Sequence, residues 1–406
     1  MNYAAARLDV VQPSASAAVS QNAKALKAAG HDVIDLGLGE PDFDTPAHIV
    51  DGAFAAAKAG KTRYPPTDGT AALKSAVIEK FKRDNGLEFA AREIIVSNGA
   101  KQVIFDAFMA TLEPQSEVIL CAPYFGQYKD MVLILGGTPV VVKCPAETGF
   151  RLTPDMLAAA ITPNTKWLLL NLPSNPSGAS YDRDQLRALG DVIRANPHVL
   201  VMADEIYEHI TFDGKPFTSF LTANPDLRDQ VLIVNGVSKA YAMTGWRIGY
   251  GAGPAGLIKA MTTVQSQISS GACSIAQAGA TIALNGPQTE VSRFCAAFEA
   301  RRDLVVNRVA DLEGLTLAPP DGAFYAYIGC ADYIGATAPD GSEISDDIAF
   351  TAYLLSEAKI AAVPGSAYDL SPFFRISTAT TEAILNTAMD RITTALAKLT
   401  PKGKLT

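Results

Sequence analysis

The chain has 406 residues, of which 48% are hydrophobic and 19% are charged, and its formal net charge at pH 7 is −8. This composition is typical of a folded protein with a large core and excludes a disordered chain. The acidic charge, without a block dense in lysine and arginine, argues against nucleic acid as a partner, and no apolar run approaches the roughly 18 residues of a membrane span.

The N-terminus and the metal-binding residue types carry no special signal. The N-terminus lacks the basic flank and apolar core of a signal peptide, so we expect a cytoplasmic protein without membrane partners. The five cysteines include no C-x-x-C pair, and the four histidines lack the spacing of metal ligands. We therefore predict reduced, buried thiols and no metal site.

The predicted elements fall into two groups along the chain. Residues 33–46, "VIDLGLGEPDFDTP", contain a short strand and a glycine- and proline-rich turn. From about residue 90 to 255, apolar runs alternate with helical patterns, which indicates an α/β fold. Most runs are continuously apolar, as in strands buried on both faces, so we predict a mainly parallel sheet sandwiched by helices. These runs are "EIIVS", "EVILCA", "TPVVVK", "KWLLLN", "HVLVMA", "QVLIVN" and "WRIGYGAG".

After about residue 290 the pattern changes. A long helical stretch, "RFCAAFEARRDLVVNRVADL", precedes the strand-like runs "GAFYAYI", "IAAVP" and "FFRIST" and a last amphipathic helix. We predict a large α/β domain over residues 47–289. A smaller α+β domain is then formed by residues 1–46 and 290–406 together.

Polar and special residues follow the apolar runs at their carboxyl ends. The segments are "NGAKQ", "PYFGQY", "LPSNPSG", "DEIYEH" and "GVSKAY". In parallel α/β sheets these strand ends lie along one edge, where ligands bind. We therefore expect residues far apart in the sequence to meet in one crevice.

A dinucleotide-binding motif is the first alternative to weigh. The segment "GAGPAG" formally matches G-x-G-x-x-G, but the next acidic residue after it is Glu290, too far away to hold a ribose hydroxyl. We interpret these glycines as a strand-to-helix turn, which disfavours a nicotinamide oxidoreductase.

Four features together outline a different pocket. Lys239 lies among apolar residues, where burial favours the neutral, nucleophilic amine. Arg247 offers a fork for phosphate, and the helix that begins in "SNGAKQ" offers free backbone N–H groups to an anion. Asp204 leaves an apolar strand and needs a cationic partner, while Tyr207 presents a phenol nearby. Each feature alone also fits an ordinary helix cap, salt bridge or surface side chain.

Pyridoxal phosphate requires all of these groups at once. Its aldehyde condenses with a lysine, its phosphate needs a helix terminus and an arginine, and its ring nitrogen needs an anion to stay protonated. We therefore predict pyridoxal 5′-phosphate as the cofactor.

The motifs "GEPDFDTP", "NLPSNPSG", "DEIYEH" and "SKAYAMTGWRIGY" resemble those of fold-type I pyridoxal phosphate aminotransferases, within them the bacterial aspartate/prephenate aminotransferase branch. The resemblance extends in order from "VQPSAS" to "FRIST". It implies that Lys239 condenses with the cofactor and shuttles the substrate proton. It also implies that Asp204 pairs with the ring nitrogen, and that Asn175 and Tyr207 bind the phenolic oxygen. The further cofactor-binding residues that it implies are Gly99, Ala100, Lys101, Phe125, Ser238, Arg247 and Tyr64.

Tyr64 matches a tyrosine that in this family reaches the phosphate in the neighbouring subunit, which implies a homodimer with shared active sites. Arg375 matches the arginine that grips the substrate α-carboxylate, and Gly39 would lie against the bound substrate together with Asn175. Lys101 and Ser16 match residues that contact the distal carboxylate of acidic substrates. Gln12 replaces an arginine that is associated with prephenate use.

We therefore expect an aminotransferase that moves the amino group of an L-amino acid, with aspartate favoured, to 2-oxoglutarate by a ping-pong mechanism. On the same fold, the alternatives are an aminotransferase for prephenate, aromatic amino acids or alanine, and a carbon–sulfur lyase. A non-enzymatic effector-binding domain is disfavoured because the chain has no room for an added DNA-binding domain.

Overall fold

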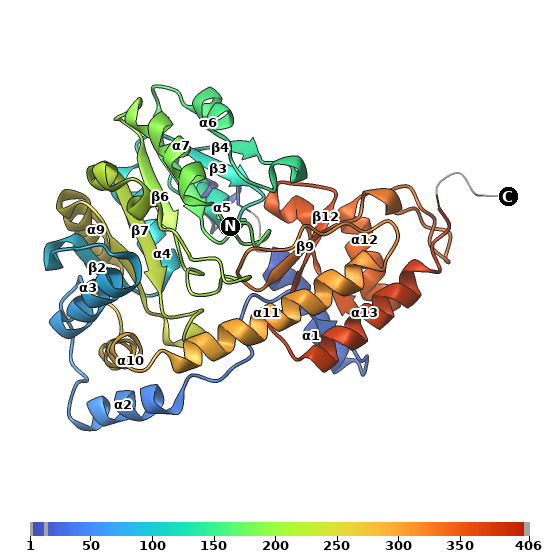
Figure 1. The fold of residues 1–406 in the computed structure, drawn as a ribbon, viewed down its shortest axis with the longest axis horizontal. Helices are drawn as coiled ribbons and strands as arrows, with labels where there is room; N and C mark the ends of the chain where they lie inside the picture. Colours follow the sequence, from blue (N-terminus) through green and yellow to red (C-terminus); the bar gives the residue numbers. More distant parts are fainter. Residues whose placement is uncertain (1–2, 12–14, 402–406) are drawn as a thin grey trace.

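The structure is a computed structural model that describes residues 3–11 and 15–401. Its centre is a seven-stranded sheet of order β2-β8-β7-β6-β5-β3-β4 (Figure 1). Every apolar run expected to form a strand in this part of the chain does so. The strands are β2 (Ile94–Ser97), β3 (Glu117–Ala122), β4 (Thr138–Lys143), β5 (Thr165–Asn171), β6 (Leu200–Asp204), β7 (Val231–Gly236) and β8 (Gly249–Ala252). Neighbouring strands run parallel except where β8 pairs with β2 and β7.

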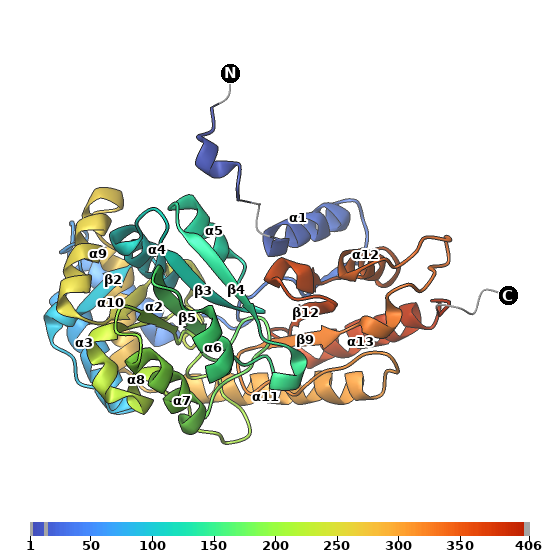
Figure 2. The same ribbon diagram turned by 90° about the horizontal axis from the view of Figure 1, so that it is seen from above.

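Alternate residues of each strand face two separate helical layers, which explains why the runs are apolar without interruption. Val231 and Ile233 of β7 join one apolar cluster, and Leu232 and Val234 join another on the other side of the sheet. Figure 2 shows the second layer opposite α7 and α8. The first layer contains α3 (Ala71–Asn85), α7 (Arg183–Arg194), α8 (Phe220–Ala223) and α10 (Ser274–Asn285), and the second contains α4 (Ala100–Thr111), α5 (Gln127–Ile134) and α9 (Ala255–Ile268). The predicted α/β fold class is thus confirmed.

Local sequence signals set the ends of these helices. The hydroxyl of Thr70 accepts a hydrogen bond from the backbone N–H of Leu73 at the start of α3, and Gly86 ends the helix with a φ of 66°. Asp182 and Gln185 form a reciprocal capping box at the start of α7.

The C-terminal part forms a three-stranded sheet of order β11-β12-β9, and its strand β10 pairs with β1 of the N-terminal segment. In Figure 1 the long helix α11 runs from the large sheet to this region. Its strands are β1 (Ile34–Asp35), β9 (Tyr325–Gly329), β10 (Ile360–Ala361), β11 (Val363–Pro364) and β12 (Phe373–Ser377). The remaining helices are α1 (Ala15–Ala28), α2 (Ala47–Lys58), α6 (Pro154–Ala160), α11 (Thr289–Ala310), α12 (Asp347–Tyr353) and α13 (Glu382–Leu396).

The N-terminal segment packs with the C-terminal part, as expected. Ile34 of β1 lies in register with Ile360 of β10, and Leu36 joins an apolar cluster with Phe374 and Ile376. The division into domains at residues 46 and 290 stays a prediction. Over the described ranges, none of the helices combines the length and apolar character needed to cross a bilayer.

Candidate active site

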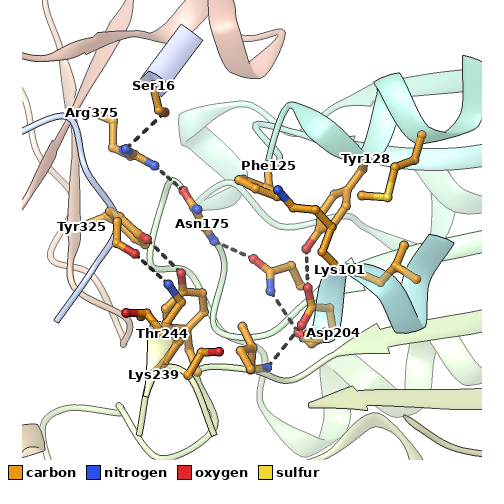
Figure 3. A pocket seen from close by; sticks show the side chains of 18 of the residues that line it. Ser16, Lys101, Phe125, Tyr128, Asn175, Asp204, Lys239, Thr244, Tyr325 and Arg375 are labelled. Atoms are coloured by element: carbon orange, nitrogen blue, oxygen red, sulfur yellow. Dashed lines mark hydrogen bonds between the residues drawn. The ribbon is translucent and has the colours of Figure 1, made fainter. Parts of the chain in front are cut away.

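A cavity of about 260 Å³ lies at the carboxyl ends of β5, β6 and β7 (Figure 3). Residues from the strand ends, loops and helices of the large α/β part line most of it, and Tyr325 and Arg375 line it from the C-terminal region. The cavity brings together all of the expected site residues except Gly99 and Tyr64. Those in its lining are Ser16, Gly39, Ala100, Lys101, Phe125, Asn175, Asp204, Tyr207, Ser238, Lys239, Arg247 and Arg375.

Lys239 follows β7 and projects toward the N-terminal segment. Its Nζ donates a hydrogen bond to the carbonyl oxygen of Gly39 at 2.6 Å and lies 5.9 Å from the ring centre of Tyr207. Burial lowers the pKa of Lys239 to about 8, against the opposing charge of Glu40. A substantial fraction of the amine is therefore neutral near pH 8 and able to act as a nucleophile or base.

Asp204 ends β6 at the floor of the cavity and is 5% exposed. Its carboxylate accepts hydrogen bonds from the Tyr128 hydroxyl at 2.5 Å and from the Ile206 backbone N–H at 3.3 Å. Burial raises the pKa of Asp204 to about 6, although both hydrogen bonds act in the opposite direction. The side chain is thus mostly ionised at neutral pH, and a cationic ligand in the cavity would complement it.

A line of polar groups connects Asp204 to Arg375 across the cavity (Figure 3). The side chain of Asn171 donates to the carbonyl of Asp204 at 3.0 Å and accepts from the backbone N–H of Asn175 at 2.7 Å. Asn175 in turn accepts from Arg375 Nη1 at 2.9 Å. The large sheet and the C-terminal region are therefore in direct contact through the site.

Arg375 lies on β12 and is 2% exposed, so it is a fixed, buried cation. Its Nη2 donates to the carbonyl of Gly37 at 2.5 Å, and its guanidinium lies 4.5 Å from the ring centre of Tyr325. Among the described residues its Nε has no hydrogen-bond partner. A carboxylate in the cavity would supply the acceptors that this guanidinium still needs.

The opposite end of the cavity is built to receive an anion. Gly99, with a φ of 85°, precedes α4, and a Cβ at this position would collide with the guanidinium of Arg247. The side chain of Arg247 therefore lies directly against the turn where the first N–H groups of α4 point outward. Gly99 has no side chain that could occupy the first N–H groups of α4.

Lys101 lies at the same end, near Phe125. Its Nζ donates to Gln127 Oε1 at 2.8 Å and lies 5.3 Å from the Phe125 ring centre. Burial and the charge of Arg247 lower the pKa of Lys101. Tyr207 lies deeper in the cavity, where its hydroxyl is 2.8 Å from that of Tyr325, and burial raises its pKa.

Tyr64 lies away from the cavity, and Gln12 lies outside the residues that the structure describes. Tyr64 is 94% exposed and lines a separate groove between α2 and α10, so its role in a neighbouring subunit stays a prediction. The "GAGPAG" turn follows β8, which runs antiparallel to β7, so it lies at the sheet edge opposite the cavity. This placement removes the structural support for a dinucleotide site.

The sequence interpretation missed four polar residues that the structure places in the lining. Tyr128 and Asn171 contact Asp204, Tyr325 contacts Tyr207, and Thr244 lies beside them. Tyr128 and Asn171 belong to "PYFGQY" and "KWLLLN", two segments that already marked the carboxyl edge. Extending the search to every polar side chain at these strand ends would have found both.

Comparison with known proteins agrees with this geometry. The family model "Aminotransferase class I and II" matches residues 31–392. The aspartate aminotransferase of Rhizobium meliloti (strain 1021) is 50% identical over 97% of this chain and 96% of its own length. The aspartate/prephenate aminotransferase of Cereibacter sphaeroides is 51% identical over 94% of this chain and 96% of its own.

Solved structures give the same result. The aspartate aminotransferase from Rhizobium meliloti superposes with a TM-score of 0.96 at 50% identity, covering 98% of this chain and all of that one. The aspartate aminotransferase from Thermus thermophilus, solved with maleate, gives 0.90 at 38% identity, covering 97% of this chain and 100% of that one. The chain therefore belongs to the class I and II aminotransferase family.

Proposed function

We propose that this aminotransferase uses pyridoxal phosphate to transfer the amino group of an L-amino acid, with aspartate favoured, to 2-oxoglutarate. The observation that carries this proposal is the arrangement of the Lys239 amine, whose pKa is lowered, the buried Asp204 carboxylate and the buried Arg375 guanidinium around a single cavity. The names of the Rhizobium meliloti and Cereibacter sphaeroides relatives support the choice of aspartate.

The residues present fit the cofactor. The turn at Gly99, where any Cβ would collide with Arg247, leaves backbone N–H groups and a guanidinium for the phosphate, together with Ala100 and Ser238. Asp204 would pair with the ring nitrogen, and Phe125 would stack on the ring. Asn175 and Tyr207 would hold the phenolic oxygen. When bound, the cofactor supplies an aldehyde for the lysine and an electron sink for the substrate carbanion.

The remaining steps belong to residues of the chain. Arg375 would bind the substrate α-carboxylate through its fork, with Gly39 close to the substrate backbone. Once the substrate amine has displaced it, neutral Lys239 would accept the proton from the substrate Cα and would release it to the former aldehyde carbon of the cofactor. Tyr325, in contact with both Tyr207 and Arg375, lines the cavity on this side.

Acidic substrates are favoured by two polar groups that line the cavity. Lys101 is held beside Phe125, and the hydroxyl of Ser16 lies 3.5 Å from Arg375 Nη2. Both would contact the distal carboxylate of aspartate. The maleate in the Thermus thermophilus structure is a dicarboxylate of similar size. Prephenate is the second candidate acceptor, because the Cereibacter sphaeroides relative is named for it.

The assembly and location are proposals of the same kind. We propose a cytoplasmic homodimer in which the exposed Tyr64 of one subunit completes the phosphate site of the other. We also propose the division into a large domain over residues 47–289 and a small one from both chain ends. The two apolar clusters, one around the large sheet and one around β9 and β12, support this division.

An amino-donor screen tests the function. The purified protein, loaded with pyridoxal phosphate, is mixed with 2-oxoglutarate and aspartate, alanine or phenylalanine, and glutamate formation is followed. We expect aspartate to be the best donor. A preference for alanine or phenylalanine would overturn the acidic assignment, and the absence of glutamate with every donor would overturn the proposed reaction.

A further inference from the structure

The two turns that carry the reactive groups are joined beneath the cavity by one glutamate. Asp204 ends β6, Tyr207 lies on the turn that follows it, and Lys239 lies on the turn after β7. Glu208, on the first turn, is 4% exposed and bonds to the end of β7. We propose that Glu208 is a positioning residue that fixes Lys239 relative to Asp204, an inference that rests on the proposed function.

Glu208 contacts strand β7 through the side chain of Asn235. Asn235 Nδ2 donates to Glu208 Oε1 at 2.7 Å, and Asn235 Oδ1 accepts from the backbone N–H of Gly236 at 2.7 Å. Asn235 is 2% exposed and precedes Lys239 by four residues in the chain. Its side chain therefore connects Glu208 to the backbone that leads directly into the Lys239 turn.

Glu208 is also bound to helix α3, through Lys80 and Asn85. Lys80, whose side chain is fully buried, forms an ion pair with Glu208 Oε1, and Asn85 Nδ2 donates to Glu208 Oε2 at 3.0 Å. Lys80 also donates to Asn85 Oδ1 at 2.9 Å. The positive charge of Lys80 lowers the pKa of Glu208 despite its burial. Glu208 is thus a permanent anion with both oxygens engaged.

The neighbouring Glu205 differs from Glu208 in its hydrogen-bond partners and in its charge. Glu205 follows Asp204 directly and accepts hydrogen bonds from the Ser219 hydroxyl and the Phe220 backbone N–H. Burial raises the pKa of Glu205 to about 8, so it is mostly protonated at neutral pH. Glu208, and not Glu205, therefore carries the negative charge that connects the turn after β6 to α3 and β7.

A metal site is the competing explanation for this cluster. Ligand atoms of Asp84, Glu208 and His209 lie within 4.8 Å of one another. However, Glu208 Oε1 already contacts Lys80 and Asn235, and Asp84 already contacts His209 at 3.0 Å. A cation would have to displace the buried ammonium of Lys80, so the cluster is better explained as an anchor.

The experiment compares Glu208→Gln and Asn235→Ala with a matched control, Glu117→Gln. Glu117 is a half-buried carboxylate at the other edge of the same sheet, where it accepts hydrogen bonds from Thr162 and Thr165. For each protein, the Kd of pyridoxal phosphate for the apo-protein, the thermal midpoint, kcat and KM for aspartate are measured.

Glu208→Gln is expected to raise the Kd of pyridoxal phosphate and to lower kcat, each by about 10-fold, because the reactive groups lose their relative placement. KM for aspartate stays within about two-fold, since Arg375 is held by other residues. Asn235→Ala leaves the Lys80 ion pair intact and is expected to raise the Kd of pyridoxal phosphate and to lower kcat by about 3-fold each. If Glu208→Gln does not fold, Asn235→Ala alone tests the positioning role.

Wild-type Kd and kcat in both variants, or equal losses in Glu117→Gln, would overturn the positioning role while leaving the proposed function intact. A wild-type protein that takes up no pyridoxal phosphate would instead overturn the proposed function and, with it, this inference.

Discussion

The two edges of the seven-stranded sheet differ in what their polar residues contact. At the carboxyl edge, Lys239 bonds to Gly39, 200 positions away in the sequence, and Asp204 bonds to Tyr128. At the opposite edge, Glu117 bonds to hydroxyl groups at the start of the adjacent strand β5. The first edge collects groups from both parts of the molecule, and their burial shifts the pKa of Lys239 and Asp204. The two groups with shifted pKa values therefore lie at the strand ends, where segments from both parts of the molecule meet.

The largest effect should follow from removing the amine. Lys239→Ala is expected to lower kcat by at least about 10⁴-fold, because the side chain serves as both nucleophile and base. Single-turnover mixing with aspartate measures this loss. The exposed Lys259 of α9 offers a control, since Lys259→Ala should leave the rate unchanged.

Arg375→Lys should weaken substrate binding next. A lysine cannot offer the planar fork, so KM for aspartate is expected to rise about 100-fold, which steady-state kinetics will show. The control is Arg228→Lys, because Arg228 contacts Glu93 at the opposite edge of the sheet. A similar rise in that control would show that the effect is not specific to the cavity.

Lys101→Met should change selectivity more than rate. The ratio of kcat/KM for aspartate to that for alanine is expected to fall about 10-fold, because the distal carboxylate loses its cation. Alanine has no such carboxylate, so its own kcat/KM should change little. An unchanged ratio would place the recognition of acidic side chains elsewhere.

Tyr128→Phe should change the pKa of Asp204 and, with it, the pH dependence of cofactor binding. The Tyr128 hydroxyl lowers the pKa of Asp204, so its removal is expected to raise that pKa above about 6. A group whose pKa rises is protonated over a wider range, and the affinity for pyridoxal phosphate should then decline between pH 7 and pH 6 more steeply than in the wild type. Titrations of the apo-protein at several pH values will test this.

The smallest effect concerns stability. Asp106, in α4 on the far side of the anion-binding turn, is buried, and neither carboxylate oxygen has a hydrogen-bond partner in the described part of the chain. Burial raises the pKa of Asp106 to about 7 from an ordinary 3.8. Since the folded state binds the proton more tightly, this stabilising contribution is complete below about pH 4 and is lost as pH rises through 7.

Asp106→Asn is therefore expected to raise the thermal midpoint by a few degrees at pH 8 and by less at pH 5. Thermal unfolding followed at both pH values measures the difference. An equal shift at the two pH values would mean that Asp106 does not titrate in this way.

Much of the fold and the central residues of the site could be predicted from the sequence. Continuous apolar runs predicted the strands because both faces of the sheet are buried, and the polar segments after them predicted Asp204, Lys239 and the anion-binding turn. The reversed direction of β8 could not be read from its run, because an apolar strand looks the same either way. Its direction moved the "GAGPAG" turn away from the cavity.

Side-chain contacts between residues far apart in the sequence could not be predicted. Nothing in the pattern around Tyr128 shows that its hydroxyl meets Asp204, or that the side chain of Asn235 connects to Glu208. The close approach of Gly99 to the guanidinium of Arg247 depends on where Arg247 lies in space. Such features depend on how separate elements pack, which a single sequence does not encode locally.

Peptide mapping after borohydride reduction tests the central claim most directly. The protein, incubated with pyridoxal phosphate, is reduced, digested and analysed by mass spectrometry. We expect one modified peptide, with the phosphopyridoxyl group on Lys239, and loss of the yellow colour. A group attached to other lysines with Lys239 unmodified, or no attached group at all, would contradict the account.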